Sequence, residues 1–164
     1  MLVDQLVAAT APWANFYSGS SLVQNAVTFG HLGGMVMSGG LAIATDRSVV
    51  GKASVSPEER RRHLKAASGT HRWVILGLGI TMITGALMLA ADLEYLIVSR
   101  AFWIKMGLLG LLLANGLFIT RQEGVVSSTH PALTRHWRRL RRLSMTSFLL
   151  WFAVVLAGVA MGNA

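Results

Sequence analysis

The chain contains no cysteine, only 3 prolines and few charged residues, which make up 13% of its 164 residues. Without cysteine, the chain cannot form disulfides, thiolate-ligated clusters or a covalent haem linkage through a Cys-x-x-Cys-His motif. An average soluble domain carries about 25% charged residues, so the low charge content places this chain among membrane proteins. Its length suits one compact bundle, and we expect a single transmembrane domain over residues 1–164.

Acidic residues are also scarce. The chain has 7 Asp and Glu residues and 15 Lys and Arg residues, which gives a net charge of +8. Nearly all of the basic residues fall in two segments that connect apolar runs, Asp46–Arg72 and Thr120–Leu143. The positive-inside rule explains this distribution, so we expect no nucleic-acid partner. The same rule predicts that both basic loops lie inside and both termini outside. We expect a bacterial inner-membrane protein, for which the outer side is periplasmic.

Four apolar runs are long enough to cross a hydrocarbon core about 30 Å thick as helices that rise about 1.5 Å per residue. We expect these crossings at residues 22–45, 71–91, 101–119 and 144–161. A short polar turn at residues 92–100 joins the second crossing to the third. The pattern predicts an all-α, four-helix transmembrane bundle in contact with the lipid bilayer.

The N-terminal segment Met1–Ser21 is mildly apolar and carries one charge, on Asp4. Pro12 is expected to end a first helical piece, because proline removes a main-chain donor. Trp13 and Tyr17 suit the depth of the lipid headgroups. We therefore expect an interfacial N-terminal helix on the outer face.

Two helix boundaries have local signals. Asp46 and Arg47 are expected to end the first crossing, because charged residues are costly within the hydrocarbon core. The run Ser56–Glu59 reads Ser-Pro-Glu-Glu. A capping serine, proline at the first helical position and acids in the first turn predict a helix start there.

Small and polar residues mark two further features. Gly30, Gly34 and Ser38 form a ridge of small residues on the first crossing, which another helix or a flat cofactor can approach closely. Asn115 lies near the inner end of the third crossing, where we expect its amide to hydrogen-bond a neighbouring helix.

His31 lies about 10 Å below the outer edge of the first crossing, at about 1.5 Å per residue. An ionisable residue at this depth is a candidate functional residue. It could be an axial ligand of a b-type haem or a copper ligand. The alternative is a neutral histidine that hydrogen-bonds a facing serine, threonine or carbonyl.

A second ligand for His31 is less obvious, because no other histidine lies at a matched depth. Met88 and Met82 on the second crossing bracket the depth of His31 and could complete a haem or a Cu(I) site, since copper(I) favours thioether ligands. The alternative is that these methionines only fill the core.

Lys105 lies near the outer end of the third crossing. It could extend to the outer headgroups or pair with Asp92 or Glu94. It could instead be a cationic anchor for a haem propionate, a quinone carbonyl or an anionic substrate. Because Lys105 and His31 have similar depths, one site in the outer leaflet is possible.

The sequence resembles a group of small bacterial four-helix membrane proteins that carry a domain-of-unknown-function label. The resemblance rests on the stretches His31–Gly34, Thr84–Leu87 and Ala101–Lys105, together with Tyr95 and Asn115. More distantly, the chain resembles the copper-resistance D membrane domain and the four-helix b-type cytochromes. It departs from the cytochromes because it lacks a second matched intramembrane histidine. The resemblance implies the four-helix fold and no particular activity.

The sequence contains no nucleophile–base pair, carboxylate pair or phosphate loop, so we expect no enzyme in the chain by itself. The function predicted is a small accessory or redox-linked subunit that holds a b-type haem near His31. A copper-handling transport protein is the first alternative. A cofactor-free structural subunit of a larger membrane complex is the second. The expected protein partners are other membrane subunits or further copies of this chain.

Overall fold

The computed structural model describes residues 2–51, 56–128 and 134–162, and within them the chain forms six helices and no strand. These are α1 (Leu2–Ser18), α2 (Ser21–Val50), α3 (Pro57–Ala91), α4 (Leu93–Val98), α5 (Arg100–Ser128) and α6 (Thr134–Gly162). Helices α2, α3, α5 and α6 each contain a segment long and apolar enough to cross a membrane. The predicted all-α bundle of four spanning helices is therefore confirmed.

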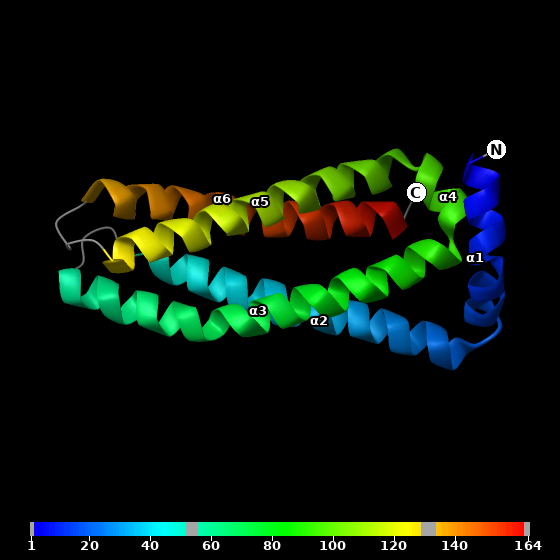
Figure 1. Cartoon of the computed structure of the whole chain (residues 1–164), viewed down its shortest axis with the longest axis horizontal. Coiled ribbons are helices and arrows are strands. Elements are labelled where there is room, and N and C mark those ends of the chain that lie inside the picture. The colour runs from blue at the N-terminus through cyan, green and yellow to red at the C-terminus, as the bar shows by residue number, and fades with distance from the viewer. Residues whose placement is uncertain (1, 52–55, 129–133, 163–164) are drawn as a thin grey trace.

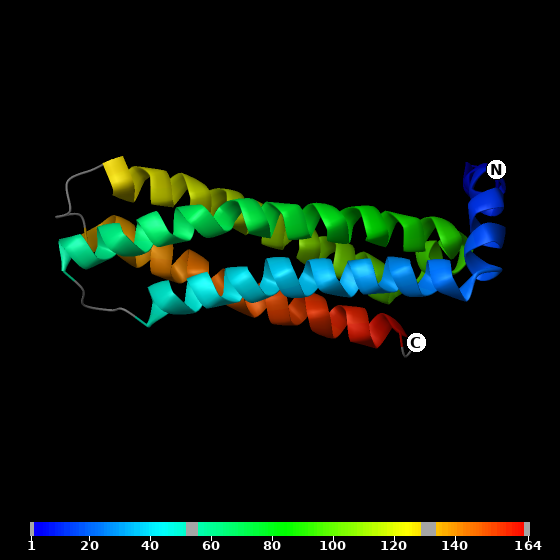
Figure 2. The same cartoon turned by 90° about the horizontal axis from the view of Figure 1, so that it is seen from below.

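The four long helices run side by side along the long axis of the molecule (Figures 1 and 2). Helix α1 lies across one end of this bundle, next to α4. Helix α2 packs against α3, α5 packs against α6, and contacts between α2 and α6 join the two pairs. The α2–α3 and α5–α6 connections lie at the end opposite α1, whereas α6 ends on the same side of the bundle as α1 (Figure 1).

Helix α3 begins with the predicted capping signal. The Ser56 hydroxyl accepts a hydrogen bond from the Glu59 main-chain N–H over 3.3 Å, and the Glu59 carboxylate accepts one from the Ser56 N–H over 3.2 Å. This reciprocal pair satisfies donors that a helix start leaves free. Helix α3 then continues without a break to Ala91. Its apolar part, Gly69–Ala91, matches the expected crossing closely.

Helix α2 runs on past Asp46 and Arg47 to Val50, so these two residues do not mark the end of the helix, and the prediction that they end the first crossing stays a prediction. Asp46 is only 5% exposed and faces α6, whose hydroxyl groups hydrogen-bond its carboxylate. Arg47 next to it is exposed. A charged residue that finds polar partners inside the bundle does not have to end a helix.

The prediction that Pro12 ends a helical piece is wrong, because α1 is continuous from Leu2 to Ser18. A proline inside a helix costs about 3 kcal/mol. Contacts between α1 and the rest of the chain offset this cost. In particular, the Trp13 indole N–H donates a hydrogen bond to the Leu87 carbonyl of α3 over 2.8 Å. The predicted N-terminal helix is present.

Helices α2 and α3 approach closely along the predicted ridge of small residues. A Cβ atom added to Gly34 would lie 2.8 Å from the carbonyl oxygen of Gly77, and one added to Gly77 would lie 2.8 Å from the main-chain nitrogen of Ser38. The ridge therefore packs against another helix, which is one of the two possibilities that the sequence left open.

Two apolar clusters fill the centre of the bundle. The first cluster joins α2, α5 and α6, and its buried members are Val49, Ile119, Trp137 and Leu140. The second joins α5 and α6 around the Trp151 ring, and its buried members are Leu112, Trp151 and Val154. Outside these clusters, large apolar side chains such as Leu22, Ile83, Leu111 and Leu149 are more than half exposed. Such a surface suits contact with lipid rather than water.

Candidate functional site

His31 lies on α2 with its imidazole against α3. Its Nδ1 atom is 3.1 Å from the main-chain oxygen of Thr81 and 3.2 Å from the hydroxyl oxygen of Thr84. A carbonyl oxygen only accepts hydrogen bonds, so Nδ1 must carry the hydrogen. This arrangement corresponds to the histidine that hydrogen-bonds a facing threonine and carbonyl.

The Thr84 hydroxyl supports the same assignment. It donates its own hydrogen to the Ile80 carbonyl over 2.7 Å, which leaves its oxygen free to accept from His31. In the neutral imidazole, Nε2 then carries the lone pair. Within the part of the chain that the structure describes, no residue donates a hydrogen bond to Nε2. A ring held at Nδ1 with Nε2 unshared is the form in which histidine binds a metal.

The His31 ring also packs on the backbone of α3 at Gly85. A Cβ atom added to Gly85 would lie 3.2 Å from the Cε1 atom of His31. A glycine at this position therefore leaves room for the Cε1 and Nδ1 edge of the imidazole against α3. This contact and the hydrogen bonds to Thr81 and Thr84 all come from α3, so that helix alone positions the ring.

Lys105 projects from α5 into the space beside α6. Its Nζ atom would lie 3.6 Å from a Cβ atom added to Gly158, which is an ordinary contact distance and places the ammonium beside α6. Lys105 is half-buried, and its positive charge acts on His31. Among residues 2–51, 56–128 and 134–162, no hydrogen bond or ion pair to the Lys105 ammonium is found, and none forms with Asp92 or Glu94.

The two methionines differ in where they point. Met88 is half-buried and lies on the face of α3 that also carries Thr84, one turn away, and Thr81, two turns away. Met82 is 51% exposed and lies off that face. The structure therefore brings His31 and Lys105 together, places Met88 on the adjoining helix face and turns Met82 outward.

Two observations limit what this site can hold. Within the described residues, no group of three or more His, Asp or Glu side chains could hold a metal ion. In addition, Gly30 and Gly34 face Thr84 and Gly77 of α3, so their side of α2 is filled. A flat group that binds His31 therefore cannot lie between α2 and α3 at this ridge.

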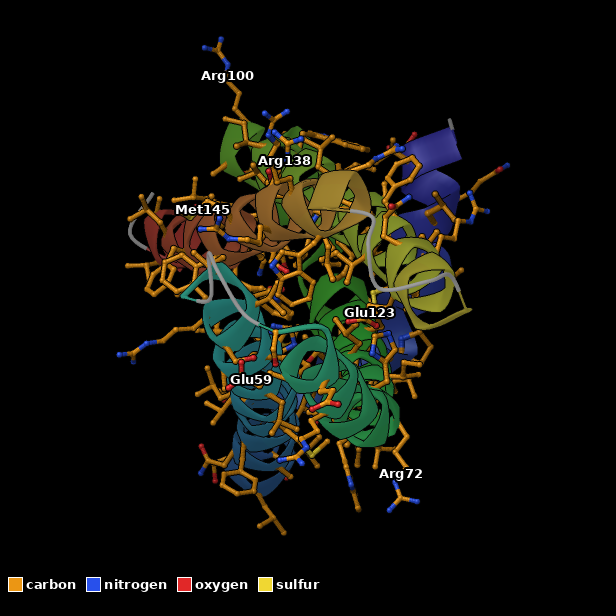
Figure 3. The ribbon with its side chains drawn as sticks, turned by 90° about the vertical axis from the view of Figure 1, so that its left-hand side faces the viewer. Glu59, Arg72, Arg100, Glu123, Arg138 and Met145 are labelled. Atoms are coloured by element: carbon orange, nitrogen blue, oxygen red, sulfur yellow. The ribbon has the colours of Figure 1, made fainter. Side chains whose placement is uncertain are left out.

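A second polar group, which the sequence reasoning missed, lies at the other end of the bundle. The Asp46 carboxylate accepts hydrogen bonds from the Ser144 and Ser147 hydroxyls of α6. All three side chains are at most 5% exposed. Glu123 of α5 lies close enough for its charge to act on Asp46. In the end-on view, Glu123 lies toward the interior of the bundle, whereas Arg72 points away from it (Figure 3).

A signal for this group was present in the sequence. Ser144 and Ser147 are three residues apart and so share one face of a helix near its basic end. Asp46 lies near the basic end of another helix, at a similar depth.

The prediction that the Asn115 amide hydrogen-bonds a neighbouring helix is confirmed, because this amide donates a hydrogen bond to the Leu143 carbonyl of α6 over 3.0 Å.

Comparison of the chain with protein-family models, with curated proteins and with solved structures found no match.

Proposed function

We propose that this chain is an accessory redox subunit of a bacterial inner membrane that holds one b-type haem, with His31 as the axial ligand. The observation that carries this proposal is the hydrogen bond from His31 Nδ1 to the Thr81 carbonyl. It fixes the tautomer and the ring orientation and leaves Nε2 as the ligand atom. When bound, the haem would supply one-electron transfer, and the chain by itself would have no enzymatic activity.

Lys105 supports the proposal through its charge. Its ammonium is half-buried near His31, and it has no acceptor within the described residues. An uncompensated cation at this depth is costly unless an anion joins it. A haem propionate is an anion of the required kind, so Lys105 would bind a propionate while His31 binds the iron.

Met88 is the candidate for the second axial position, because a thioether opposite a histidine is an established haem ligand pair. It shares a helix face with Thr84, which contacts the His31 ring. Met82 points outward and is the matched residue without this role. The donor set of one imidazole and one thioether fits a haem. Because the small-residue ridge of α2 is packed against α3, the haem ring would have to lie on the side of His31 that faces α5 and α6.

The distribution of basic residues supports the orientation in this proposal. The α2–α3 and α5–α6 connections would lie in the cytoplasm, and α1, α4 and both termini would lie on the periplasmic side. Other subunits or further copies of the chain would cover part of the apolar surface and exchange electrons with the haem. The small bacterial four-helix proteins that the sequence resembles are proposed relatives.

Absorption spectra of the purified chain test the haem. Protein from membranes, or protein mixed with haemin, should give a Soret band and sharp α and β bands after reduction with dithionite. His31→Ala should lose these bands and remain helical by circular dichroism. The matched variant His71→Ala changes a histidine near the start of the apolar segment of α3, nearly three turns from Thr81, and should keep them.

Three other outcomes count against the haem. A wild-type chain that neither contains nor takes up haem overturns it. Bound copper without haem would favour the copper-handling alternative. A chain without either cofactor that co-purifies with a large complex would favour the structural-subunit alternative. Retention of the full spectrum by His31→Ala would remove the ligand role of His31.

A further inference from the structure

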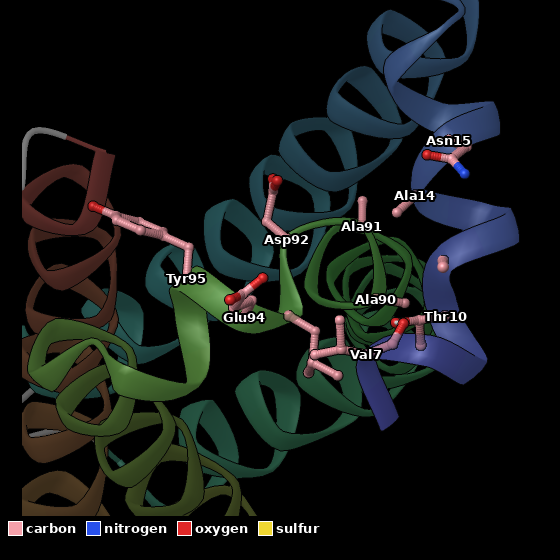
Figure 4. A pocket seen from close by; sticks show the side chains of 11 residues that line it. Val7, Thr10, Ala14, Asn15, Ala90, Ala91, Asp92, Glu94 and Tyr95 are labelled. Atoms are coloured by element: carbon pink, nitrogen blue, oxygen red, sulfur yellow. Dashed lines mark hydrogen bonds between the residues drawn. The ribbon is translucent and has the colours of Figure 1, made fainter. Parts of the chain in front are cut away.

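A cavity of about 500 Å³ lies at the α1 end of the bundle, between α1, the end of α3 and α4 (Figure 4). One wall is a face of α1 that includes Ala11 and Ala14, and the opposite wall includes Ala90 and Ala91 of α3. These small side chains are what leave the space open. Its volume falls within the range of about 300–1,000 Å³ that is usual for small-molecule sites.

The charge around this cavity is negative. Asp92 and Glu94 are the charged residues in its lining, which contains no lysine, arginine or histidine. Both carboxylates are exposed, and neither forms an ion pair within the part of the chain that the structure describes.

The cavity is held open by contacts that do not need a ligand. The Trp13 indole bonds the Leu87 carbonyl and fixes α1 across the end of α3. The Gln24 amide of α2 donates to the carbonyl oxygens of Tyr17 and Ser18 over 3.1 and 3.2 Å, which fixes the end of α1. A preformed site avoids the cost of ordering its walls when a ligand binds.

We propose that this cavity binds a lipophilic monocation, which is an onium or ammonium group joined to an apolar body. The alanine walls suit the apolar body, and the two carboxylates suit the positive charge. The headgroup of a zwitterionic lipid fits less well, because its phosphate would meet two carboxylates and no basic lining residue. This site is independent of the haem proposal.

Two ions of equal shape and opposite charge test the proposal on the purified full-length chain in a non-ionic detergent. Equilibrium dialysis against radiolabelled tetraphenylphosphonium should show saturable binding of about one ion per chain. Tetraphenylborate, measured against the same protein-free micelles, should show no saturable binding. Equal binding of both ions would mean that shape and apolarity alone govern the site, and the proposal would be wrong.

Variants locate the binding. The double variant Asp92→Asn, Glu94→Gln should bind tetraphenylphosphonium at least tenfold more weakly; the Asp92 side chain makes no capping hydrogen bond that its loss would break. Ala14→Phe should block binding without a change in charge. Asp4→Asn, which removes a charge from α1 outside the cavity lining, should bind as the wild type does.

Helical circular dichroism and gel filtration confirm that each variant is folded before its affinity is compared. Wild-type affinity in the double variant would exclude the cavity as the site. Phosphatidylethanolamine added to the micelles should not displace the phosphonium. If it does so at stoichiometric amounts, the occupant is a lipid amine, and the monocation proposal fails.

Discussion

Gly34 of α2 and Gly77 of α3 approach so closely that a Cβ atom added to Gly34 would lie 2.8 Å from the Gly77 carbonyl oxygen. Gly34→Ala should therefore force the two helices apart and destabilise the bundle by about 1–3 kcal/mol. Gly33→Ala is the matched control, because nothing lies within 4 Å of a Cβ atom at that position. Thermal unfolding in detergent compares the two variants. Equal melting temperatures for them would contradict the close contact.

The hydrogen bonds between Asp46 and the hydroxyls of α6 can be measured with a double-mutant cycle. Asp46→Ala should cost about 1–3 kcal/mol, because it leaves two buried hydroxyl groups without their acceptor. Ser147→Ala alone should cost less, and the two changes together should cost less than the sum of the single changes. The exposed neighbour is the control, and Arg47→Ala should be close to neutral. Strict additivity in the cycle would show that Asp46 and Ser147 do not interact.

The bond from Trp13 to Leu87 predicts how α1 is attached. Trp13→Phe keeps an aromatic ring but removes the donor, and it should destabilise the docking of α1 by about 1 kcal/mol. Limited proteolysis near Gly19, between α1 and α2, should then become faster. Trp73→Phe changes an exposed tryptophan of α3 and should leave the cleavage rate unchanged. An unchanged rate in Trp13→Phe would mean that other contacts hold α1.

The two methionines of α3 give a matched test of the second haem ligand. Met88→Leu should shift the absorption spectrum of the reduced protein and lower its midpoint potential, because a thioether ligand raises the potential. Met82→Leu should leave both unchanged, since Met82 is 51% exposed and points outward. A spectral change in the second variant, or none in the first, would assign the axial position elsewhere.

The orientation in the membrane can be read from reporter fusions. Fusions after Arg62 and after Arg139 should give a cytoplasmic signal, and a fusion near Glu94 should give an external one, because basic segments remain on the inner side. A cytoplasmic signal near Glu94 would reverse the whole topology and move the His31 site to the inner leaflet.

Hydropathy and local signals were sufficient to predict the four spanning helices. The capping box at Ser56, the four apolar spans and the hydrogen bond of the Asn115 amide to another helix were all predictable from the sequence. The similar depths of His31 and Lys105 in the membrane, which were estimated from their positions along the helices, stay a prediction.

The sequence did not show how each helix is rotated about its own axis. A membrane-spanning helix is apolar on all sides, so its sequence does not show which face looks inward. This is why Met82 and Met88 looked equivalent although only Met88 lies on the face next to His31. Because the inward faces of α2 and α6 were not known, the pairing of Asp46 with α6 was not predicted. The helix α4 within the expected polar turn was missed because six residues are too few for a periodic signal.

The pairing of Asp46 with α6 also sets an order of events during synthesis. Asp46 leaves the ribosome long before Ser144 and Ser147 exist, so its carboxylate has no hydroxyl partners while α2 enters the membrane. Until α6 has been made, the Asp46 carboxylate needs water or lipid headgroups as partners, because an unpartnered carboxylate costs about 2.5–3.5 kcal/mol in a hydrocarbon core. Helix α6 therefore supplies the last hydrogen-bond partners of a side chain on α2. A nascent chain that stops before α6 leaves the Asp46 carboxylate without its two serine partners.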